Sequence, residues 1–274
     1  MGVPYAEVIG DPIAHSKSPA IHKFWLEKLG LEGDYRAVRV APDGLRAYFE
    51  TRRCDPDWRG CNVTIPHKEC VVSMLDKLED GGIGAVNCIV PSDGRLVGWN
   101  TDSGGIDHAW DFAVDTDAPV CVIGAGGAAK AAFASLDMLA VCQFHVIARD
   151  PAKARPLLAL HEGYARHFGF DQAEQALSGC VGAINATPLG MSGFARMPDS
   201  VLRGLAGIRR GGFAVDLVYS PLDTVFLSRA REEGLKAVDG LTVLIGQAHY
   251  AFFRFFGASP CREDDVQLRA LLLQ

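Results

Sequence analysis

The sequence lacks any apolar run approaching the roughly 20 residues of a membrane-spanning helix, so we predict no transmembrane segment. Basic residues are also in deficit. The 27 Lys and Arg stand against 33 Asp and Glu, and the net charge of −6 argues against nucleic acid as the main partner. The first residues show no basic segment followed by an apolar one, so no signal peptide is predicted. We expect a cytoplasmic protein.

The cysteines lack the spacing of a metal or redox site. None of the eight belongs to a Cys-x-x-Cys pair, and no His-x-x-x-His spacing accompanies them. A disulfide scaffold is not expected in a chain of this length without a secretion signal, and no metal site is predicted. We interpret them as reduced, mostly buried, small side chains.

The 274 residues, 49% of them hydrophobic and 22% charged, suit a globular protein of two domains. In the first part, strand-like and helix-like segments alternate and are followed by two strand-like runs around a Ser-Asp-Gly turn, which predicts a hairpin. This order indicates an α/β domain with a mixed sheet. Ser18 suits the N-cap and Pro19 the first position of the first helix. The predicted strands are 5–10, 34–40 and 59–65. The helices begin near 18, 43 and 67, the third ending at 78, and the hairpin lies within 85–102.

A second alternating series starts at residue 118. Apolar strands of four to six residues are separated by helical segments, which predicts a parallel, doubly wound, Rossmann-like sheet. Two helices, 241–257 and 262–273, then end the chain. The strand-containing segments of this series are 118–136, 142–150, 180–191, 211–221 and 234–240.

A glycine-rich turn follows the first strand of this second series. In "VCVIGAGGAAKA", Gly124 permits a tight turn, Gly126 lets the backbone approach a pyrophosphate, and Ala129 allows close packing of helix on strand. The helix start favours an anion, so we predict a dinucleotide at this turn, with Gly127 and Ala128 also in contact.

The choice between NADP and NAD depends on the end of the next strand, "VIARDPAKA". Arg149 and Lys153 favour the 2′-phosphate of NADP, whereas Asp150 favours the ribose hydroxyl of NAD. Asp150 has an equally good alternative role as the cap of the helix that starts at Pro151. We favour NADP and leave NAD open. Asn185 and Thr187 follow a later strand and are expected to line the cofactor cleft, as is Gly240.

Polar residues gather in five further stretches, "GDPIAHSKSP", "NVTIPHK", "GAVNC", "WNTD" and "IGQA". Together with "GAGGAAKA", "NATPLGM" and "DLVYSPLDT", their order along essentially the whole chain resembles the shikimate dehydrogenase family. The resemblance implies reversible hydride transfer between shikimate and 3-dehydroshikimate, within the biosynthesis of chorismate and the aromatic amino acids. Its partner is therefore a small molecule, and the protein is expected to be a monomer or homodimer.

The resemblance also implies roles for individual residues. Lys68 and Asp102 match the catalytic pair, which takes and returns the hydroxyl proton. Ser16, Ser18 and Tyr219 match groups that bind the carboxylate, and Thr64, Asn87 and Gln247 match those that hold ring hydroxyls. His15 and His67 are treated as structural or orienting. The implied domains are a substrate-binding catalytic domain, 1–102 with 240–274, and an NADP-binding Rossmann domain, 103–239.

Two positions depart from the family pattern. Ala148-Arg149-Asp150 replaces the usual Asn-Arg-Thr or Asn-Arg-Ser, and Val243 replaces a methionine that packs by the nicotinamide. The alternatives are therefore an NAD-using quinate/shikimate or aminoshikimate dehydrogenase and a catalytically silent sensor of a shikimate-like ligand. The presence of both Lys68 and Asp102 argues against the sensor, since binding alone needs no proton carrier.

Overall fold

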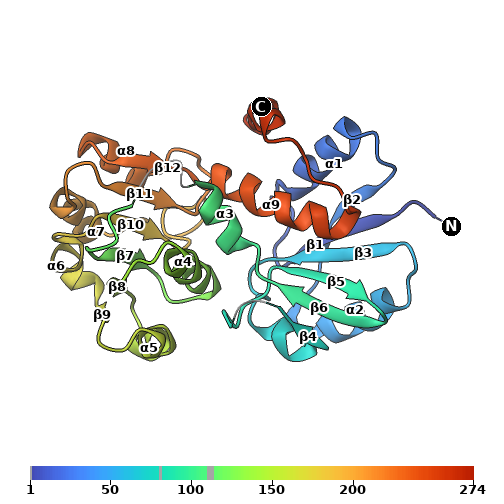
Figure 1. Cartoon of the computed structure of the whole chain (residues 1–274), viewed down its shortest axis with the longest axis horizontal. Coiled ribbons are helices and arrows are strands. Elements are labelled where there is room, and N and C mark those ends of the chain that lie inside the picture. Colours follow the sequence, from blue (N-terminus) through green and yellow to red (C-terminus); the bar gives the residue numbers. More distant parts are fainter. Residues whose placement is uncertain (1, 80–81, 110–113) are drawn as a thin grey trace. The chain divides into compact units, whose positions relative to one another are not determined.

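The computed structural model describes residues 2–79, 82–109 and 114–274 (Figure 1). By its internal contacts the chain divides into two compact units, which we call unit 1 (Met1–Thr101 with Ile245–Gln274) and unit 2 (Asp102–Leu244). The predicted domain ranges place Asp102 and residues 240–244 in the first domain, whereas these contacts place them in unit 2.

Unit 1 is built on a six-stranded mixed sheet with the strand order β2-β1-β3-β5-β6-β4 (Figure 1). Strand β1 pairs parallel with β2 and β3, whereas β5 runs antiparallel to β3 and β6. The predicted mixed sheet is confirmed. Its strands are β1 (Tyr5–Gly10), β2 (Asp34–Arg39), β3 (Trp58–Val63), β4 (Lys77–Leu78), β5 (Cys88–Ser92) and β6 (Arg95–Trp99), and its helices are α1 (Ser18–Lys28), α2 (Leu45–Arg53), the part of α9 (Gly240–Phe256) from Ile245 onward, and α10 (Asp265–Leu272), with 3₁₀ turns at Pro42–Gly44, Cys70–Met74 and Arg262–Asp264.

The predicted hairpin is confirmed between β5 and β6. Asp93 and Gly94 form its two-residue loop, and their φ angles of 51° and 75° both lie in the left-handed region. A two-residue turn with two positive φ angles matches the twist of the flanking strands, and Asp-Gly is a preferred sequence for it.

Two local predictions in unit 1 are wrong. Residues 67–78 do not form an α-helix, because only Cys70–Met74 is helical, as a 3₁₀ turn, and Lys77–Leu78 is strand β4. Pairing of β4 with β6 overrides the apolar spacing, and Asp76 fixes this edge by accepting from the Leu96 amide at 2.7 Å. Ser18 is not the N-cap of α1 either. Lys17 holds that position, and Ser18 is the first helical residue.

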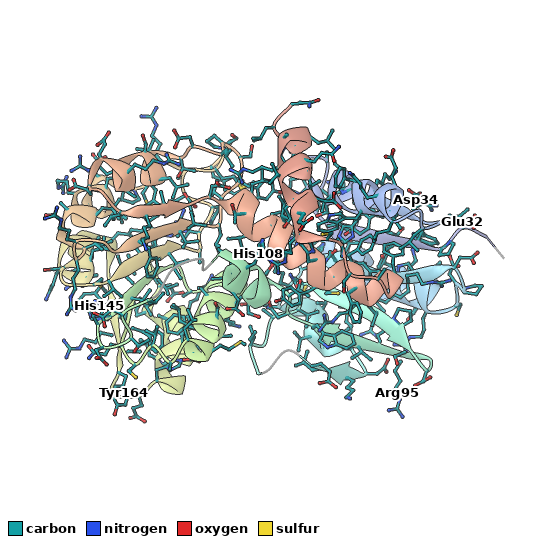
Figure 2. All side chains as sticks on the ribbon, turned by 45° about the horizontal axis from the view of Figure 1, so that its top comes forward. Glu32, Asp34, Arg95, His108, His145 and Tyr164 are labelled. Carbon is teal, nitrogen blue, oxygen red and sulfur yellow. The ribbon has the colours of Figure 1, made fainter. Side chains whose placement is uncertain are left out.

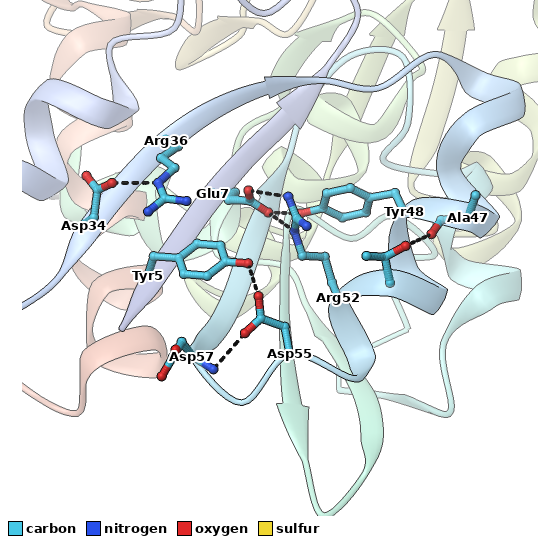
Figure 3. Close-up of polar contacts among 10 residues, drawn as sticks. Tyr5, Glu7, Asp34, Arg36, Ala47, Tyr48, Arg52, Asp55 and Asp57 are labelled. Carbon is cyan, nitrogen blue, oxygen red and sulfur yellow. Dashed lines mark hydrogen bonds and ion pairs between the residues drawn. The ribbon is translucent and has the colours of Figure 1, made fainter. Parts of the chain in front are cut away.

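A buried ion pair joins β1 to α2 in unit 1 (Figure 3). Glu7 is 1% exposed, and its two carboxylate oxygens accept from Arg52 Nε at 2.7 Å and Nη2 at 2.9 Å. The Tyr48 hydroxyl donates to the same carboxylate at 2.6 Å. A forked guanidinium and a phenol thus replace the water that this carboxylate loses on folding.

Unit 2 is a fully parallel sheet with the order β12-β11-β10-β7-β8-β9 (Figure 1). In chain order this is 6-5-4-1-2-3, the doubly wound order of dinucleotide-binding folds, and the predicted fold class is confirmed. Its strands are β7 (Val120–Ile123), β8 (Phe144–Ile147), β9 (Ala165–Phe168), β10 (Gly182–Asn185), β11 (Phe213–Asp216) and β12 (Lys236–Val238), and its helices are α3 (Asp102–Ala109), α4 (Gly127–Met138), α5 (Pro151–Leu160), α6 (Ala173–Leu177), α7 (Asp199–Gly204), α8 (Val225–Glu232) and the start of α9 (Gly240–Phe256), with 3₁₀ turns at Phe170–Gln172 and Leu205–Gly207.

Strands β7, β10 and β11 of unit 2 are buried along their whole length, as expected for the centre of a sheet covered on both faces. His145 on β8 (Figure 2) donates from Nδ1 to the Ala176 carbonyl oxygen at 2.5 Å, which ties α6 to the sheet. Burial lowers the pKa of His145, so its imidazole is neutral at physiological pH.

The cysteines are all free thiols, but the expectation that most are buried is wrong. Four are buried and four are exposed, the exposed ones being Cys54, Cys70, Cys142 and Cys261. Within the described ranges, no helix is both long and apolar enough to cross a bilayer.

Candidate active site

Strand direction gathers the polar stretches of unit 1 at one edge of its sheet. Strands β1 and β3 are parallel, so the segments after them share an edge. Because β5 runs antiparallel to β3 and β6 antiparallel to β5, the start of β5 and the end of β6 lie at that same edge. The residues that this topology brings to one edge are Ser16, Ser18, Thr64, Lys68, Asn87 and Thr101.

The segment after β1 carries two serines. The Ser18 amide donates to Ser16 Oγ at 3.3 Å, and Ser18 is buried with its hydroxyl against the Tyr35 phenol. Between them, the Lys17 ammonium donates to the carbonyl oxygen of Leu272 at 2.6 Å, at the C-terminal end of α10. A cation there satisfies a free carbonyl and complements the helix dipole. The two serines are thus held by both α1 and α10.

The turn after β3 carries Thr64 and Lys68. Its first residues are closed by the His67 amide, which donates to the Thr64 carbonyl oxygen at 2.9 Å. The Lys68 carbonyl accepts from the Val86 amide at 2.8 Å, so the turn is also fixed to the segment before β5. The His67 ring is fully buried, with Nε2 2.6 Å from the Val40 carbonyl oxygen. This contact fits the orienting role predicted for His67.

Asn87, Thr101 and Gln247 form one hydrogen-bonded cluster in unit 1. The Asn87 amide nitrogen donates to Thr101 Oγ1 at 3.0 Å and to Gln247 Oε1 at 3.3 Å. Thr101 donates from its backbone amide to Asn87 Oδ1 at 2.6 Å and from its hydroxyl to Gln247 Oε1 at 3.1 Å. The sequence separates these residues by up to 160 positions, and α9 supplies Gln247 to the strand edge.

Sequence reasoning missed three supporting groups in unit 1. Tyr35 donates to Asn62 Oδ1 at 2.7 Å, and Asn62 Nδ2 donates to the Asn87 carbonyl oxygen at 3.0 Å. Thr101 completes the cluster described above. Asn62 lies on β3 within "NVTIPHK" and Thr101 follows β6 within "WNTD", so the available signal was a polar residue in or just after a buried strand.

Asp102 begins helix α3 and is half-buried. A carboxylate in a first helical turn is favoured by the helix dipole. Lys68 belongs to unit 1 and Asp102 to unit 2, and their pairing stays a prediction.

The glycine-rich turn of unit 2 has the geometry predicted for it. Gly124 has φ of 118°, and a Cβ there would lie 2.9 Å from Thr187 Cγ2 and 3.0 Å from the Ala186 carbonyl oxygen, so only glycine fits. Gly126 is the N-cap of α4, and no described atom lies within 4 Å of where its Cβ would be. The amides at the start of this 12-residue helix therefore border open space suited to an anion.

At the end of β8 the capping interpretation of Asp150 is confirmed. Its side chain accepts from the Ala152 amide at 2.9 Å and caps α5. Arg149 beside it and Lys153 one turn later are both exposed, so two cations and one carboxylate border this strand end. The predicted cofactor contacts of all three stay predictions.

Asn185 is the last residue of β10, Thr187 follows the strand, and the two are hydrogen-bonded to each other. Asn185 is fully buried, and its Oδ1 accepts from the Thr187 amide at 3.1 Å and hydroxyl at 2.7 Å. Its amide nitrogen donates to the Leu189 carbonyl oxygen at 3.2 Å and to Asp216 at 2.9 Å. The side chain of Asn185 therefore makes its hydrogen bonds within the protein, which favours a role in holding the loop over direct contact with the cofactor. Thr187 is half-buried and faces the Gly124 turn.

Tyr219 and Gly240 lie near the ends of β11 and β12. Burial raises the pKa of Tyr219, so its phenol stays protonated and can donate to an anion. A Cβ on Gly240 would lie 2.5 Å from the Val218 carbonyl oxygen, so glycine permits the close start of α9. Val243, where the family has methionine, packs in the core of unit 2. No group of three potential metal ligands occurs in the described part of the chain.

The strand order of unit 2 and its glycine turn define a dinucleotide-binding α/β protein, joined to a second, mixed-sheet unit. Comparison with known proteins agrees. Residues 8–89 match the model of the shikimate dehydrogenase substrate binding domain. The chain is 47% identical to a protein of Sphingopyxis alaskensis named shikimate dehydrogenase (NADP(+)), with 98% of this chain and 97% of that protein covered. The chain belongs to the shikimate dehydrogenase family.

Two solved structures support the same assignment. Shikimate 5-dehydrogenase from Thermus thermophilus, in complex with NADP(H) and shikimate, is 33% identical and has a TM-score of 0.83, over 98% of this chain and 99% of that one. The enzyme from Listeria monocytogenes, in complex with shikimate and NAD, is 28% identical and has a TM-score of 0.86, over 98% of this chain and 96% of that one. The family resemblance drawn from the motifs is confirmed.

Proposed function

We propose that this protein is an NADP-dependent shikimate dehydrogenase that interconverts shikimate and 3-dehydroshikimate. The observation that carries the proposal is the 47% identity, over almost the full length of both chains, to a relative named for this activity. The polar edge of unit 1 and the glycine turn of unit 2 supply groups of the kind that each ligand needs.

In the proposed reaction the carbon that bears the 3-hydroxyl loses a hydride and the hydroxyl loses a proton. The bound cofactor supplies the hydride acceptor. Lys68 and Asp102 orient the hydroxyl and take its proton, and they return it in the reverse direction. Neither residue is assigned alone as the base.

Shikimate carries a carboxylate and ring hydroxyls, and we assign separate residues to each. Ser16, Ser18 and the protonated Tyr219 donate to the carboxylate. Thr64, Asn87 and Gln247 hold ring hydroxyls, and Thr101 fixes the orientation of the two amides. An amide held by defined hydrogen bonds presents a known donor or acceptor, which lets a site distinguish hydroxyl positions on a ring.

Cofactor binding is assigned to the carboxyl edge of the unit 2 sheet. Gly124, Gly126, Gly127 and Ala128 approach the pyrophosphate, and Thr187 and Gly240 border the cofactor. Arg149 and Lys153 bind the 2′-phosphate of NADP. Because the Asp150 carboxylate is engaged by the Ala152 amide, it caps a helix and need not contact the ribose.

Initial rates with shikimate and quinate, each with NADP and NAD, test the proposal. We expect the highest kcat/KM for shikimate with NADP. A higher value for NAD or quinate would favour the dehydrogenases that use NAD, quinate or aminoshikimate. Measurable shikimate binding without turnover in any of the four combinations would favour a ligand sensor.

Replacing Lys68 by Met tests the proton-transfer role, since Met keeps the length of the side chain without its charge. We expect kcat to fall by about 10²–10⁴-fold, the usual contribution of a general acid–base group. The affinity for NADP, measured by quenching of protein fluorescence, should change little. Unchanged turnover would remove Lys68 from the mechanism.

We further propose that unit 1 binds substrate and unit 2 binds cofactor, in a cytoplasmic monomer or homodimer without a nucleic-acid or membrane partner. Sedimentation at several protein concentrations measures the oligomeric state. A stable tetramer would contradict this part of the proposal.

A further inference from the structure

A buried carboxylate at the end of β11 has no role in the mechanism above. Asp216 is fully buried, and three groups donate to it. Thr224 Oγ1 lies 2.6 Å from its Oδ2, and the Val218 amide and Asn185 Nδ2 lie 3.0 and 2.9 Å from its Oδ1. All three donors are neutral. Burial raises the pKa of Asp216 to about 6, so the group is charged near pH 7 although these partners bring no positive charge.

In its ionised form Asp216 can accept from all three groups at once. Each of the three contacts is a donor, and a carboxylate can accept all of them. A protonated carboxyl or an amide could still bond to Thr224, but only if the Thr224 hydroxyl rotated to accept, and its own hydrogen would then lose this acceptor. These donors, two from the loop after β11 and one from the end of β10, offset part of the cost of burying the charge.

One hydrogen bond of Asp216 connects it to the loop that carries Thr187. Asp216 holds the amide nitrogen of Asn185, which fixes the orientation of that amide. Asn185 Oδ1 then accepts from both the amide and the hydroxyl of Thr187, and Thr187 Oγ1 accepts from the Leu189 amide at 3.1 Å. The position of Thr187 beside the Gly124 turn therefore depends on Asp216 through one intermediate residue.

The other two hydrogen bonds of Asp216 connect it to the segment that carries Tyr219. Asp216 accepts from the amide of Val218, the residue immediately before Tyr219. Thr224, which holds Asp216 from the far end of the same loop, is also the N-cap of α8 and accepts from the Leu227 amide at 3.2 Å. The loops after β10 and β11 are joined again where the Ser192 amide donates to the Ser220 carbonyl oxygen at 2.8 Å.

We propose that Asp216 is a positioning residue for the reaction, whose carboxylate sets the loops after β10 and β11 together and so places Thr187 for the cofactor and Tyr219 for the substrate carboxylate. This inference rests on the proposed function, because Thr187 and Tyr219 are assigned there. Asp216 itself contacts neither ligand.

Double-mutant cycles test the proposal, since coupling energies distinguish positioning from general stability. Asp216→Asn and Tyr219→Phe are made singly and together, and KM for shikimate is measured for each. We expect each single change to raise KM, and the effect of Tyr219→Phe to shrink by about fivefold or more once Asp216 is replaced. Additive effects would overturn the proposal.

The connection from Asp216 to Thr187 is tested in the same way, by direct measurement of NADP binding. Asp216→Asn is combined with Thr187→Val, and the dissociation constant for NADP is measured by fluorescence without any turnover. We expect coupling here too. This arm gives a result even if wild-type protein shows no activity with shikimate, an outcome that would count against the proposed function instead.

A matched control separates positioning from loss of stability. Val201→Ala removes two buried methyl groups from α7 in the same unit, outside the hydrogen-bonded set. It should lower Tm while leaving KM for shikimate and the affinity for NADP unchanged. If Asp216→Asn does not fold, Thr224→Val replaces it in both cycles, because it removes one donor to the same carboxylate. An Asp216→Asn protein with wild-type constants would overturn the proposal.

Discussion

Among the described residues, the sheet of each unit contains a buried carboxylate, Glu7 in unit 1 and Asp216 in unit 2, and the two are stabilised differently. Glu7 in β1 is held by the forked guanidinium of Arg52 and by Tyr48 (Figure 3). Asp216 in β11 is held by a hydroxyl and two N–H groups, all neutral. The charge of Glu7 is thus neutralised by an adjacent cation, whereas the charge of Asp216 is stabilised only by neutral hydrogen-bond donors.

Their places on the strands explain the difference. Glu7 lies inside β1 and joins the sheet to α2, so it contributes to the packing of one face. Asp216 is the last residue of β11, at the edge where ligands bind in doubly wound sheets. A buried group at that edge can fix the positions of the loops around it. Neutral donors on those loops suit this role better than a single cation on one helix. The comparison teaches that burial of a charge alone does not identify a functional residue, and that the origin of its partners does.

The largest effect should follow from breaking the pair in unit 1. Glu7→Gln leaves the Arg52 guanidinium without its buried counter-charge, and we expect the free energy of unfolding to fall by about 3–5 kcal/mol. Urea unfolding measures this loss. Replacing all three partners together (Glu7→Leu, Tyr48→Phe and Arg52→Met) should recover most of it, because no polar group is then left unpaired. A triple variant as unstable as Glu7→Gln would contradict this account.

Asp216 should make stability depend on pH in the opposite sense to a salt-bridged carboxylate. Its pKa rises from 3.8 in the unfolded chain to about 6 in the folded protein, so the folded state holds the proton more tightly. Its stabilising contribution is complete below about pH 4 and is lost as pH rises through 6. The loss is roughly 3 kcal/mol, at about 1.4 kcal/mol for each pKa unit.

Urea unfolding of wild type and Asp216→Asn between pH 4 and pH 7 measures this dependence. As pH rises, the wild type should lose roughly 3 kcal/mol of unfolding free energy relative to Asp216→Asn. A constant difference across the range would mean that Asp216 does not titrate there.

A smaller effect is expected where the Asp216 set meets helix α8. Thr224→Val removes both the N-cap that accepts from the Leu227 amide and a donor to the Asp216 carboxylate, and we expect a loss of about 2 kcal/mol. Thr224→Ser keeps the hydroxyl and is the control. Equal stability of the Val and Ser variants would show that neither hydrogen bond of the Thr224 hydroxyl contributes.

The smallest effect concerns a third carboxylate, Asp150, which is exposed and is held by one backbone amide. Asp150→Asn keeps the cap and removes the charge next to Arg149. We expect the ratio of kcat/KM for NADP to that for NAD to rise by about fivefold, the size of one exposed charge interaction. Asp150→Ser, also a good cap, should behave alike. A ratio that falls would show that the carboxylate assists NADP binding.

Much of the fold was predictable because its signals are local. The Asp-Gly turn predicted the hairpin, and the glycines after β7 predicted the nucleotide-type turn, since both need φ values that few other residues adopt. The wrong helix at 67–78 has the opposite origin. Its apolar spacing suits a helix, but Lys77 and Leu78 pair with β6, and that partner is distant in sequence.

The candidate site was predictable only as far as its motifs extend. The polar residues at strand ends were recognised, but the bonds that orient them were not, because Asn87 meets Gln247 and Asp216 meets Asn185 through the fold alone. Asp216 stood in the quoted stretch "DLVYSPLDT" and received no role. A buried acid held by neutral donors can be identified only once its neighbours are known.

The contact between Lys17 and the Leu272 carbonyl gives the serine loop an anchor on a helix that holds none of the assigned ligand-binding residues. Affinity for an acidic substrate can therefore be tuned from α10. Substitutions that fray its last turn would weaken carboxylate capture while every ligand-touching side chain stays the same. If Ser16 and Ser18 bind the substrate carboxylate as proposed, two proteins with identical ligand-binding residues could differ in substrate affinity through this helix alone.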